Sequence, residues 1–305
     1  MLSFTRNFVF FGGVLMKKLK IITDSNSGIK QHEGEIIDVY VVPMPFCING
    51  CEYFEEISLS TEEFYKFLSD DVNISTSMPS QYFLSELFEN TLKEYEKIIY
   101  IPMTSGLSNS YQAASNIANE FNGRVHVIDN KRISVTLKES ILEACYMRDN
   151  GYEVEDIINY LYDTKHVSSI YISVDTLKYL KKGGRVKPAA AALASLLKIK
   201  PVLFSKGDKF DTLKKCRSLS GAKRAMINQI KYEIENEFKD YYEKGVLTLS
   251  IAHTENYEEA LRFKEELIKE FPNIRFRFID SLSLSVSCHI GPGALACAII
   301  INSYC

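Results

Sequence analysis

Two short segments rich in hydroxyl side chains are the parts of this sequence best suited to hold an anion. The first is residues 75–80 (STSMPS) and the second is residues 104–110 (TSGLSNS). Each leads into a predicted helix, and the first turn of a helix offers unpaired backbone N–H groups and the positive end of the helix dipole. Ser and Thr also cap helices for purely structural reasons. Two such loops in one small domain nevertheless favour a binding site.

The elements around these loops predict parallel βαβ units. Apolar runs predict strands at residues 19–23, 36–42, 98–103 and 125–128, and apolar spacing predicts helices at 61–68, 79–95 and 111–121. In an open sheet of this kind, ligands bind at the carboxyl ends of the strands, and residues 104–110 follow such a strand. The second hydroxyl loop is therefore expected at the binding edge of the sheet.

The pattern changes from about residue 154 onward. A helix at 154–162, a strand at 169–174 and a Gly-Gly turn at 183–184 precede strands at 201–204, 246–252 and 274–279 and helices at 222–238 and 257–269. A chain of 305 residues is long enough for two domains, so we predict two α/β domains divided near residues 155–165.

Residues 1–15 contain an apolar run after Arg6 that is too short to span a membrane. They are interpreted as an N-terminal appendage to a domain that begins near Met16.

The composition argues against several classes of protein. The 36 Lys and Arg residues against 39 Asp and Glu residues give a net charge of −3, which provides no general attraction to nucleic acid or to an anionic membrane. The seven Cys residues form no CxxC pair and indicate reduced thiols in a cytoplasm. The five His residues show no HxxxH spacing, and His126, His166 and His253 are interpreted as structural. We expect a cytoplasmic protein with no metal, no cofactor, no nucleic-acid partner and no stable membrane insertion.

Seven motifs in a set order carry a resemblance to a known family. In chain order they are residues 23–25 (TDS), 76–80 (TSMPS), 105–112 (SGLSNSYQ), 180–185 (LKKGGR), 200–203 (KPVL), 215–217 (KCR) and 289–294 (HIGPGA). Each motif alone is weak, but their joint order and spacing are specific. On these motifs residues 16–305 resemble the DegV family of fatty-acid-binding proteins.

The resemblance implies a two-domain DegV-like α/β fold. Residues 16–160 would form an N-terminal parallel-sheet βαβ domain, and residues 161–305 a C-terminal α/β domain with a mixed or antiparallel sheet that closes over an acyl chain. It also implies that one long-chain fatty acid binds between the domains as a ligand, in a carrier that is not an enzyme. The implied partner is a separate, ATP-dependent bacterial fatty acid kinase of the dihydroxyacetone-kinase-like type, which converts the carboxylate to an acyl phosphate.

Five residues of this chain occupy the family's functional positions. The resemblance implies that Thr76 and Ser108 bind the fatty acid carboxylate and that His289 lies near it. It implies a role for Arg185 and Arg217 in kinase docking or in balancing the phosphate charge.

The chain departs from the family pattern at two positions within these loops. Met78 stands where the family commonly has Gln, and Asn109 where it commonly has Gly. Asn tolerates the left-handed backbone that Gly supplies.

The residues that would contact the acyl tail are less clearly marked in the sequence. Residues 188–197 (PAAAALASLL) are a candidate for lining the acyl tail and equally for a buried helix. Leu282 and Leu284 are weaker tail candidates and are better suited to the core.

Three other interpretations compete with a carrier. Residues 106–110 (GLSNS) are similar to the Gly-x-Ser-x-Gly elbow of serine hydrolases, and Ser108, Asp280 and His289 occur in the order of such a triad. This makes an acyl-ester hydrolase the main alternative. A kinase in its own right is disfavoured because the chain has no GxxxxGK[ST] motif. A purely structural module would leave the two hydroxyl loops without a purpose.

Overall fold

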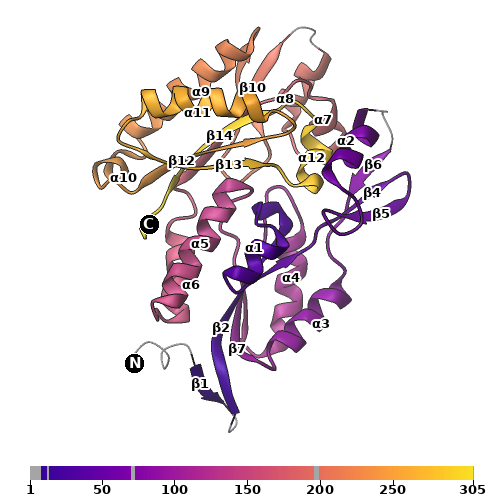
Figure 1. Cartoon of the computed structure of the whole chain (residues 1–305), viewed down its shortest axis with the longest axis vertical. Helices are drawn as coiled ribbons and strands as arrows, with labels where there is room; N and C mark the ends of the chain where they lie inside the picture. Colours follow the sequence, from indigo (N-terminus) through magenta and orange to yellow (C-terminus); the bar gives the residue numbers. More distant parts are fainter. Residues whose placement is uncertain (1–7, 12–13, 70–72, 196–198, 305) are drawn as a thin grey trace.

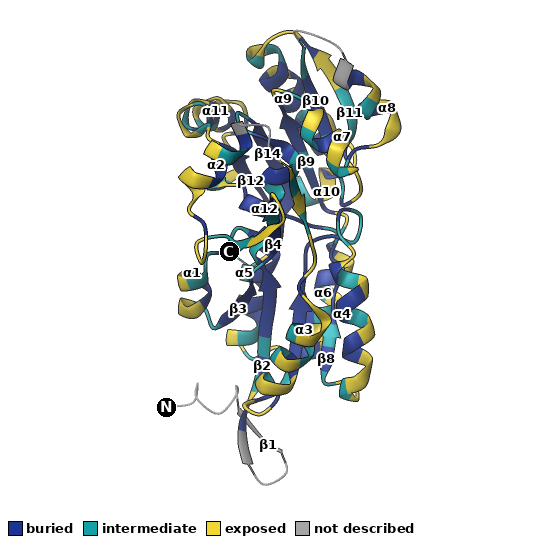
Figure 2. Cartoon of the chain, turned by 90° about the vertical axis from the view of Figure 1, so that its right-hand side faces the viewer, coloured by how far each residue is buried: buried dark blue, intermediate teal, exposed yellow. Residues whose placement is uncertain are grey.

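The computed structural model describes residues 8–11, 14–69, 73–195 and 199–304, which form two α/β halves stacked end to end (Figure 1). The chain passes from the first half to the second near residue 165. Figure 2 shows the strands of both halves as mostly buried, with helices that expose one face. This arrangement confirms the two-part α/β fold expected from the strand–helix alternation.

The first half is built on a sheet of five strands. These are β1 (Phe8–Phe11), β2 (Val14–Asp24), β3 (Val39–Val42), β7 (Tyr95–Ile101) and β8 (Val125–Val127). β3, β2, β7 and β8 are parallel neighbours in that order, and β1 is antiparallel to the start of β2. The four parallel strands confirm the predicted βαβ architecture. Residues 1–7 and 12–13 of the expected appendage lie outside the described residues, and β2 begins ahead of Met16.

Six helices and a small sheet complete this half. The helices are α1 (Gln31–Ile36), α2 (Thr61–Ser69), α3 (Gln81–Thr91), α4 (Ser110–Ala118), α5 (Val135–Asp149) and α6 (Val154–Asp163). The small antiparallel sheet has the order β5 (Cys51–Phe54), β4 (Pro45–Ile48), β6 (Ile74–Thr76). This small sheet was not predicted, because its strands are only three or four residues long.

Two predicted boundaries in this half are wrong for local reasons. The strand expected at 36–42 is the end of α1 followed by β3, with Asp38 between them at a φ of 51°. The helix expected at 79–95 is shorter, because the Ser80 hydroxyl caps it by accepting from the Phe83 N–H at 3.1 Å and because Tyr95 already begins β7. Both differences are shifts of an element end, and the elements themselves are present.

The second half has a six-stranded mixed sheet. Its order is β11 (Asp211–Cys216), β10 (Lys200–Ser205), β9 (Ser168–Ser173), β14 (Leu295–Ile301), β12 (Leu247–His253), β13 (Arg275–Ser281). Neighbours are antiparallel except β12 and β13, which are parallel. The prediction of a mixed or antiparallel sheet is confirmed. β11 and β14 were missed by the sequence analysis.

The helices of the second half lie mainly on the outer face of this sheet and at its edge. They are α7 (Lys178–Gly183), α8 (Pro188–Ala191), α9 (Leu219–Glu235), α10 (Lys239–Glu243), α11 (Tyr257–Glu270) and α12 (Leu284–Ile290). α9 and α11 cover the face of the sheet that points away from the first half (Figure 1). The opposite face of the sheet points toward α5 and the parallel sheet.

Helix α5 joins the cores of the two halves. It packs against β2 on one side and against β12 and β14 on the other. Its buried positions include Leu137 and Ile141 but also Glu139 and Glu143. Glu139 pairs with Arg277 at 3.1 Å, so its buried charge is balanced across the halves. Because the helix is covered on both sides, it lacks the one-sided apolar stripe by which α6 and α11 were predicted.

Candidate functional site

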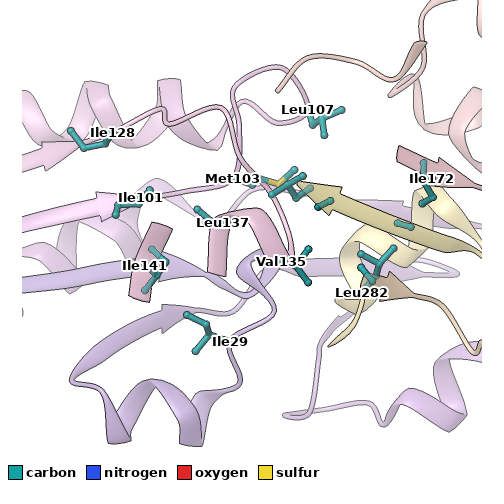
Figure 3. Close-up of a cluster of buried hydrophobic side chains, with 14 of the residues drawn as sticks. Ile29, Ile101, Met103, Leu107, Ile128, Val135, Leu137, Ile141, Ile172 and Leu282 are labelled. Atoms are coloured by element: carbon teal, nitrogen blue, oxygen red, sulfur yellow. The ribbon is translucent and has the colours of Figure 1, made fainter. Parts of the chain in front are cut away.

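A cavity of about 340 Å³ lies between the two halves of the molecule. Its walls are mostly apolar. The first half contributes the loop after β7 and the start of α5, and the second half contributes β9, β14 and α12. Figure 3 shows Met103, Leu107 and Val135 on one side with Ile172 and Leu282 on the other, and all five line the cavity. This space can enclose an apolar ligand of small-molecule size.

Four of the five predicted site residues line this cavity together. Thr76 ends β6, Ser108 precedes α4, Arg185 follows α7, and His289 lies in the last turn of α12. The Thr76 hydroxyl and His289 Nε2 are hydrogen-bonded at 2.9 Å. Segments more than two hundred residues apart in the chain thus form one polar end of the cavity, which we call the head-group site (Thr76, Ser108, Arg185, His289).

His289 is held in the neutral form. Burial and the nearby guanidinium of Arg185 lower its pKa from 6.5 to about 4. Its ring packs directly on Gly183, where a Cβ atom would lie only 2.0 Å from His289 Nδ1. Gly183 is therefore required for this ring position. A neutral imidazole bonded to a hydroxyl can rearrange to donate to an incoming anion without holding it through a full charge.

Ser108 lies at the N-terminus of α4. Its hydroxyl oxygen accepts from the backbone N–H of Ser110 at 3.2 Å and is hydrogen-bonded to the Ser110 hydroxyl at 2.9 Å. Asn109, at the N-cap position, has a φ of −84°. The left-handed backbone considered for Asn109 is thus not adopted, and the loop accepts Asn without strain. An anion beside Ser108 would face the positive end of the α4 dipole.

The two arginines occupy different environments. Arg185 donates through Nε to the backbone oxygen of Leu107 at 3.2 Å and through Nη1 to that of Gly183, and partial burial lowers its pKa. These bonds tie α7 to the hydroxyl loop of the other half. Arg217 is exposed just beyond β11 and does not line the cavity. The structure therefore brings Arg185 to the head-group site and leaves Arg217 on the surface.

The candidate tail residues are only partly placed in the cavity. None of residues 188–193 lines it; Ala190 is buried in the core while Pro188 and Ala189 are exposed. The side chains of residues 194–197 are not among those that the structure describes. Leu282 lines the cavity, whereas Leu284 packs with Phe46 and other aromatic residues beneath the small sheet. Leu282 also belongs to the buried core cluster that contains Met103 and Val135, so it is both a core residue and part of the cavity wall.

Several lining residues were missed by the sequence analysis. They are Asn26 in the turn after β2, Met103, Val135 at the start of α5, and Ala296 and Ala298 of β14. The alternation of small residues along β14 was the available signal, because residues two apart on a strand share a face. Asn26 and Met103 lie in segments that follow strands, and Val135 is the first residue of α5, so none of them belongs to a periodic pattern.

The hydrolase triad is not assembled among the described residues. The Asp280 carboxylate pairs with Lys138 at 3.0 Å, and His289 bonds Thr76. The Ser108 hydroxyl bonds that of Ser110. No described hydrogen bond joins Ser108, His289 and Asp280, so the nucleophile lacks an adjacent base and the base lacks an orienting acid.

Within residues 8–11, 14–69, 73–195 and 199–304, no group of three or more His, Cys, Asp or Glu side chains could hold a metal ion. In the same ranges no helix is both long and apolar enough to cross a bilayer.

The fold and the cavity together define a class of protein: an α/β protein of two halves that encloses an apolar cavity with one polar end. The model of the family described as "Uncharacterised protein, DegV family" matches residues 18–302. The chain therefore belongs to the DegV family.

Relatives and solved structures agree with this assignment. A DegV domain-containing protein of Caldanaerobacter subterraneus is 29% identical over 282 residues, which cover 92% of this chain and 97% of that protein. The crystal structure of DegV, a fatty acid binding protein from Bacillus subtilis, is 28% identical with a TM-score of 0.79, covering 93% of this chain and 99% of the other. A fatty acid binding DegV family protein from Streptococcus agalactiae is 25% identical with a TM-score of 0.83, covering 94% and 99%.

Proposed function

We propose that this protein binds one long-chain fatty acid in the cavity, with the carboxylate at Thr76, Ser108 and His289 and the acyl tail along the apolar walls. The observation that carries the proposal is the composition of the cavity, which combines one cluster of hydroxyl, imidazole and guanidinium groups with walls of aliphatic side chains. Fatty acid binding by the related proteins of Bacillus subtilis and Streptococcus agalactiae supports the same ligand class.

The tail supplies most of the binding free energy. Burial of a methylene group contributes about 0.8 kcal/mol, so a tail of about 14 methylenes gains roughly 11 kcal/mol before several kcal/mol of ordering costs. A carboxylate removed from water needs donors, since an unpaired buried charge is very costly. The hydroxyls of Thr76 and Ser108 and the N-terminus of α4 meet that need. The head group thus sets orientation more than affinity.

The carrier is further proposed to present this carboxylate to a separate, ATP-dependent fatty acid kinase in the bacterial cytoplasm. Support comes from the exposure of the residues beside the head-group site, Ser77, Met78 and Asn109, which leaves that end of the cavity near the surface. Arg185 is close enough to the head group to balance phosphate charge. Arg217 is exposed and available for docking.

Solvent extraction of the purified protein followed by mass spectrometry tests the ligand class. We expect about one long-chain fatty acid per chain, matched by the mass excess of the intact protein in native mass spectrometry. Bare protein that also fails to take up added oleate or palmitate would contradict fatty acid binding.

A double variant, Thr76→Ala with Ser108→Ala, tests the carboxylate assignment. We expect it to fold and to lose roughly tenfold in affinity, because two hydrogen bonds to a charged group are removed, and to be a poor substrate for the kinase. Thr76→Ser with Ser108→Thr is the matched control, since it retains both hydroxyls. Unchanged loading and phosphorylation in the alanine variant would remove Thr76 and Ser108 from the site.

A further inference from the structure

A second group of polar side chains lines the same cavity. Asn26, Ser134 and Ser285 contact the space from the turn after β2, the start of α5 and α12 respectively. We call these three residues the inner polar cluster. None of them belongs to the head-group site, and a plain alkyl chain uses none of their hydrogen-bonding capacity.

The amide of Asn26 presents an underused donor. The side chain is 2% exposed, and its oxygen accepts from the hydroxyls of Ser283, at 2.9 Å, and Ser285. These bonds direct the amide nitrogen toward Met103, whose sulfur atom lies 2.8 Å away and also lines the cavity. The same amide nitrogen also hydrogen-bonds the buried Asp24 carboxylate. A thioether is a weak acceptor, so of the two amide hydrogens the one that faces Met103 is poorly satisfied, and a ligand oxygen would be a better partner for it.

Ser134 adds a hydroxyl with no described partner. It is 7% exposed, it lines the cavity, and its backbone N–H donates to the Asn26 carbonyl at 2.8 Å, which holds the two residues side by side. Ser134 occupies the N-cap position of α5, a helix of 15 residues, but its side chain makes no capping bond. Ser134 and Val135 both line the cavity, so the start of α5 brings an unpaired hydroxyl and the positive end of the helix dipole to the cavity wall.

The inner polar cluster lies close to the head-group site. Ser285 and His289 are four residues apart on α12, and side chains at this spacing occupy the same face one turn apart. An oxygen on the acyl chain that reached the cluster would therefore be near the carboxyl end of the ligand, far from its methyl end.

We propose that the inner polar cluster binds a hydroxyl group of the acyl chain, and that the preferred ligands are fatty acids hydroxylated near the carboxylate. This inference rests on the proposed fatty acid function and specifies its substrate class. The ligand oxygen accepts from the Asn26 amide and the α5 N-terminus, and its hydrogen is donated to Ser134. An unsubstituted chain leaves these donors buried without an acceptor, which costs affinity.

Competition binding against a fluorescent fatty acid tests the inference with three probes: palmitate, β-hydroxypalmitate and ω-hydroxypalmitate. We expect β-hydroxypalmitate to bind about tenfold more tightly than palmitate, as one well-made buried hydrogen bond allows. The ω-hydroxy isomer should bind more weakly than palmitate, because its hydroxyl enters the apolar part of the cavity.

Ser134→Ala should reduce the preference for β-hydroxypalmitate over palmitate severalfold, because the ligand hydroxyl loses its acceptor. Ser134→Gly serves the same purpose if the alanine variant unfolds, since Ser134 has a φ of 55° that glycine adopts freely. Ser115→Ala is the matched control, because the Ser115 hydroxyl also lacks a partner but lies on α4 away from the cavity.

The outcomes separate this inference from the function on which it rests. Equal affinity for palmitate and β-hydroxypalmitate in the wild-type protein would overturn the hydroxyl site and leave fatty acid binding intact. An unchanged preference in both Ser134 variants would overturn the assignment to this cluster. Failure of all three probes to bind would overturn fatty acid binding and the hydroxyl site together.

Discussion

The polar end of the cavity and its apolar interior are built from different kinds of structure. The head-group site comes from segments at element ends, such as the loop before α4 and the last turn of α12, and its residues are half-buried. The interior is formed by central strands, such as β14, whose residues are fully buried. Element ends offer free hydrogen-bonding groups and central strands offer continuous apolar surface. On the proposed function, the orientation of the ligand and its affinity would therefore be controlled by separate parts of the fold.

The largest expected effect follows from filling the interior. Ala296 is buried on the cavity face of β14, and Ala296→Leu would occupy space that about three methylenes of the tail require. At about 0.8 kcal/mol per methylene, affinity for palmitate should fall about fiftyfold. Titration with palmitate measures this loss, and Ala189→Leu, at an exposed position of α8, is the control. Normal affinity in Ala296→Leu would show that the tail does not follow β14.

A substitution that displaces the His289 ring in the head-group site should lower fatty acid affinity less than Ala296→Leu does. Gly183→Ala brings a methyl group within 2.0 Å of His289 Nδ1, so the ring must move away from Thr76. We expect a tenfold loss of fatty acid affinity and a destabilisation of roughly 1–3 kcal/mol from overpacking.

Gly184→Ala is the matched control for that variant. Gly184 has a φ of +68° but open space where its Cβ would be, so the substitution costs backbone strain of about 1 kcal/mol without touching His289. Denaturant unfolding and palmitate titration of both variants separate strain from contact. Equal binding losses in the two variants would argue against a special role of the His289 ring position.

The buried His289 should also make the free energy of unfolding depend on pH. The pKa of His289 falls from 6.5 to about 4 on folding, so the unfolded chain takes up a proton at a higher pH than the folded chain does. The contribution of His289 to the free energy of unfolding is complete above pH 6.5 and declines as the pH falls to about 4. His289→Gln should flatten this part of the curve. Urea unfolding from pH 7 to pH 4 measures it, and parallel curves for the two proteins would contradict a neutral, buried imidazole.

The smallest expected effect on binding is that of Arg217→Ala. Because Arg217 is exposed and outside the cavity, we expect palmitate affinity to stay within twofold of the wild type, while phosphorylation of the fatty acid by the proposed kinase partner declines. Arg185→Ala should share the kinase defect and also weaken the contact between the halves through Leu107. Reduced palmitate binding in Arg217→Ala would place this residue nearer to the ligand than the structure does.

The helices that could be predicted are those whose environment differs between two sides. α6 and α11 expose one face and were predicted almost to the residue. β9 and β12 are buried along nearly their whole length and were predicted instead from short apolar runs. α5 was missed because protein covers both of its sides and leaves no apolar periodicity. β4, β5 and β6 were missed because three or four residues are too few to show a pattern.

The same distinction applies to the site. Thr76, Ser108 and His289 belong to short motifs, and they were selected because those motifs resemble the DegV family. The structure brings all three to one cavity. Local sequence signals determined the α/β class and the order of most elements. The cavity was decided only by the tertiary structure. Its walls come from residues as distant as Asn26, Val135 and Ala296, and no local rule predicts which apolar side chains of separate elements will face the same space.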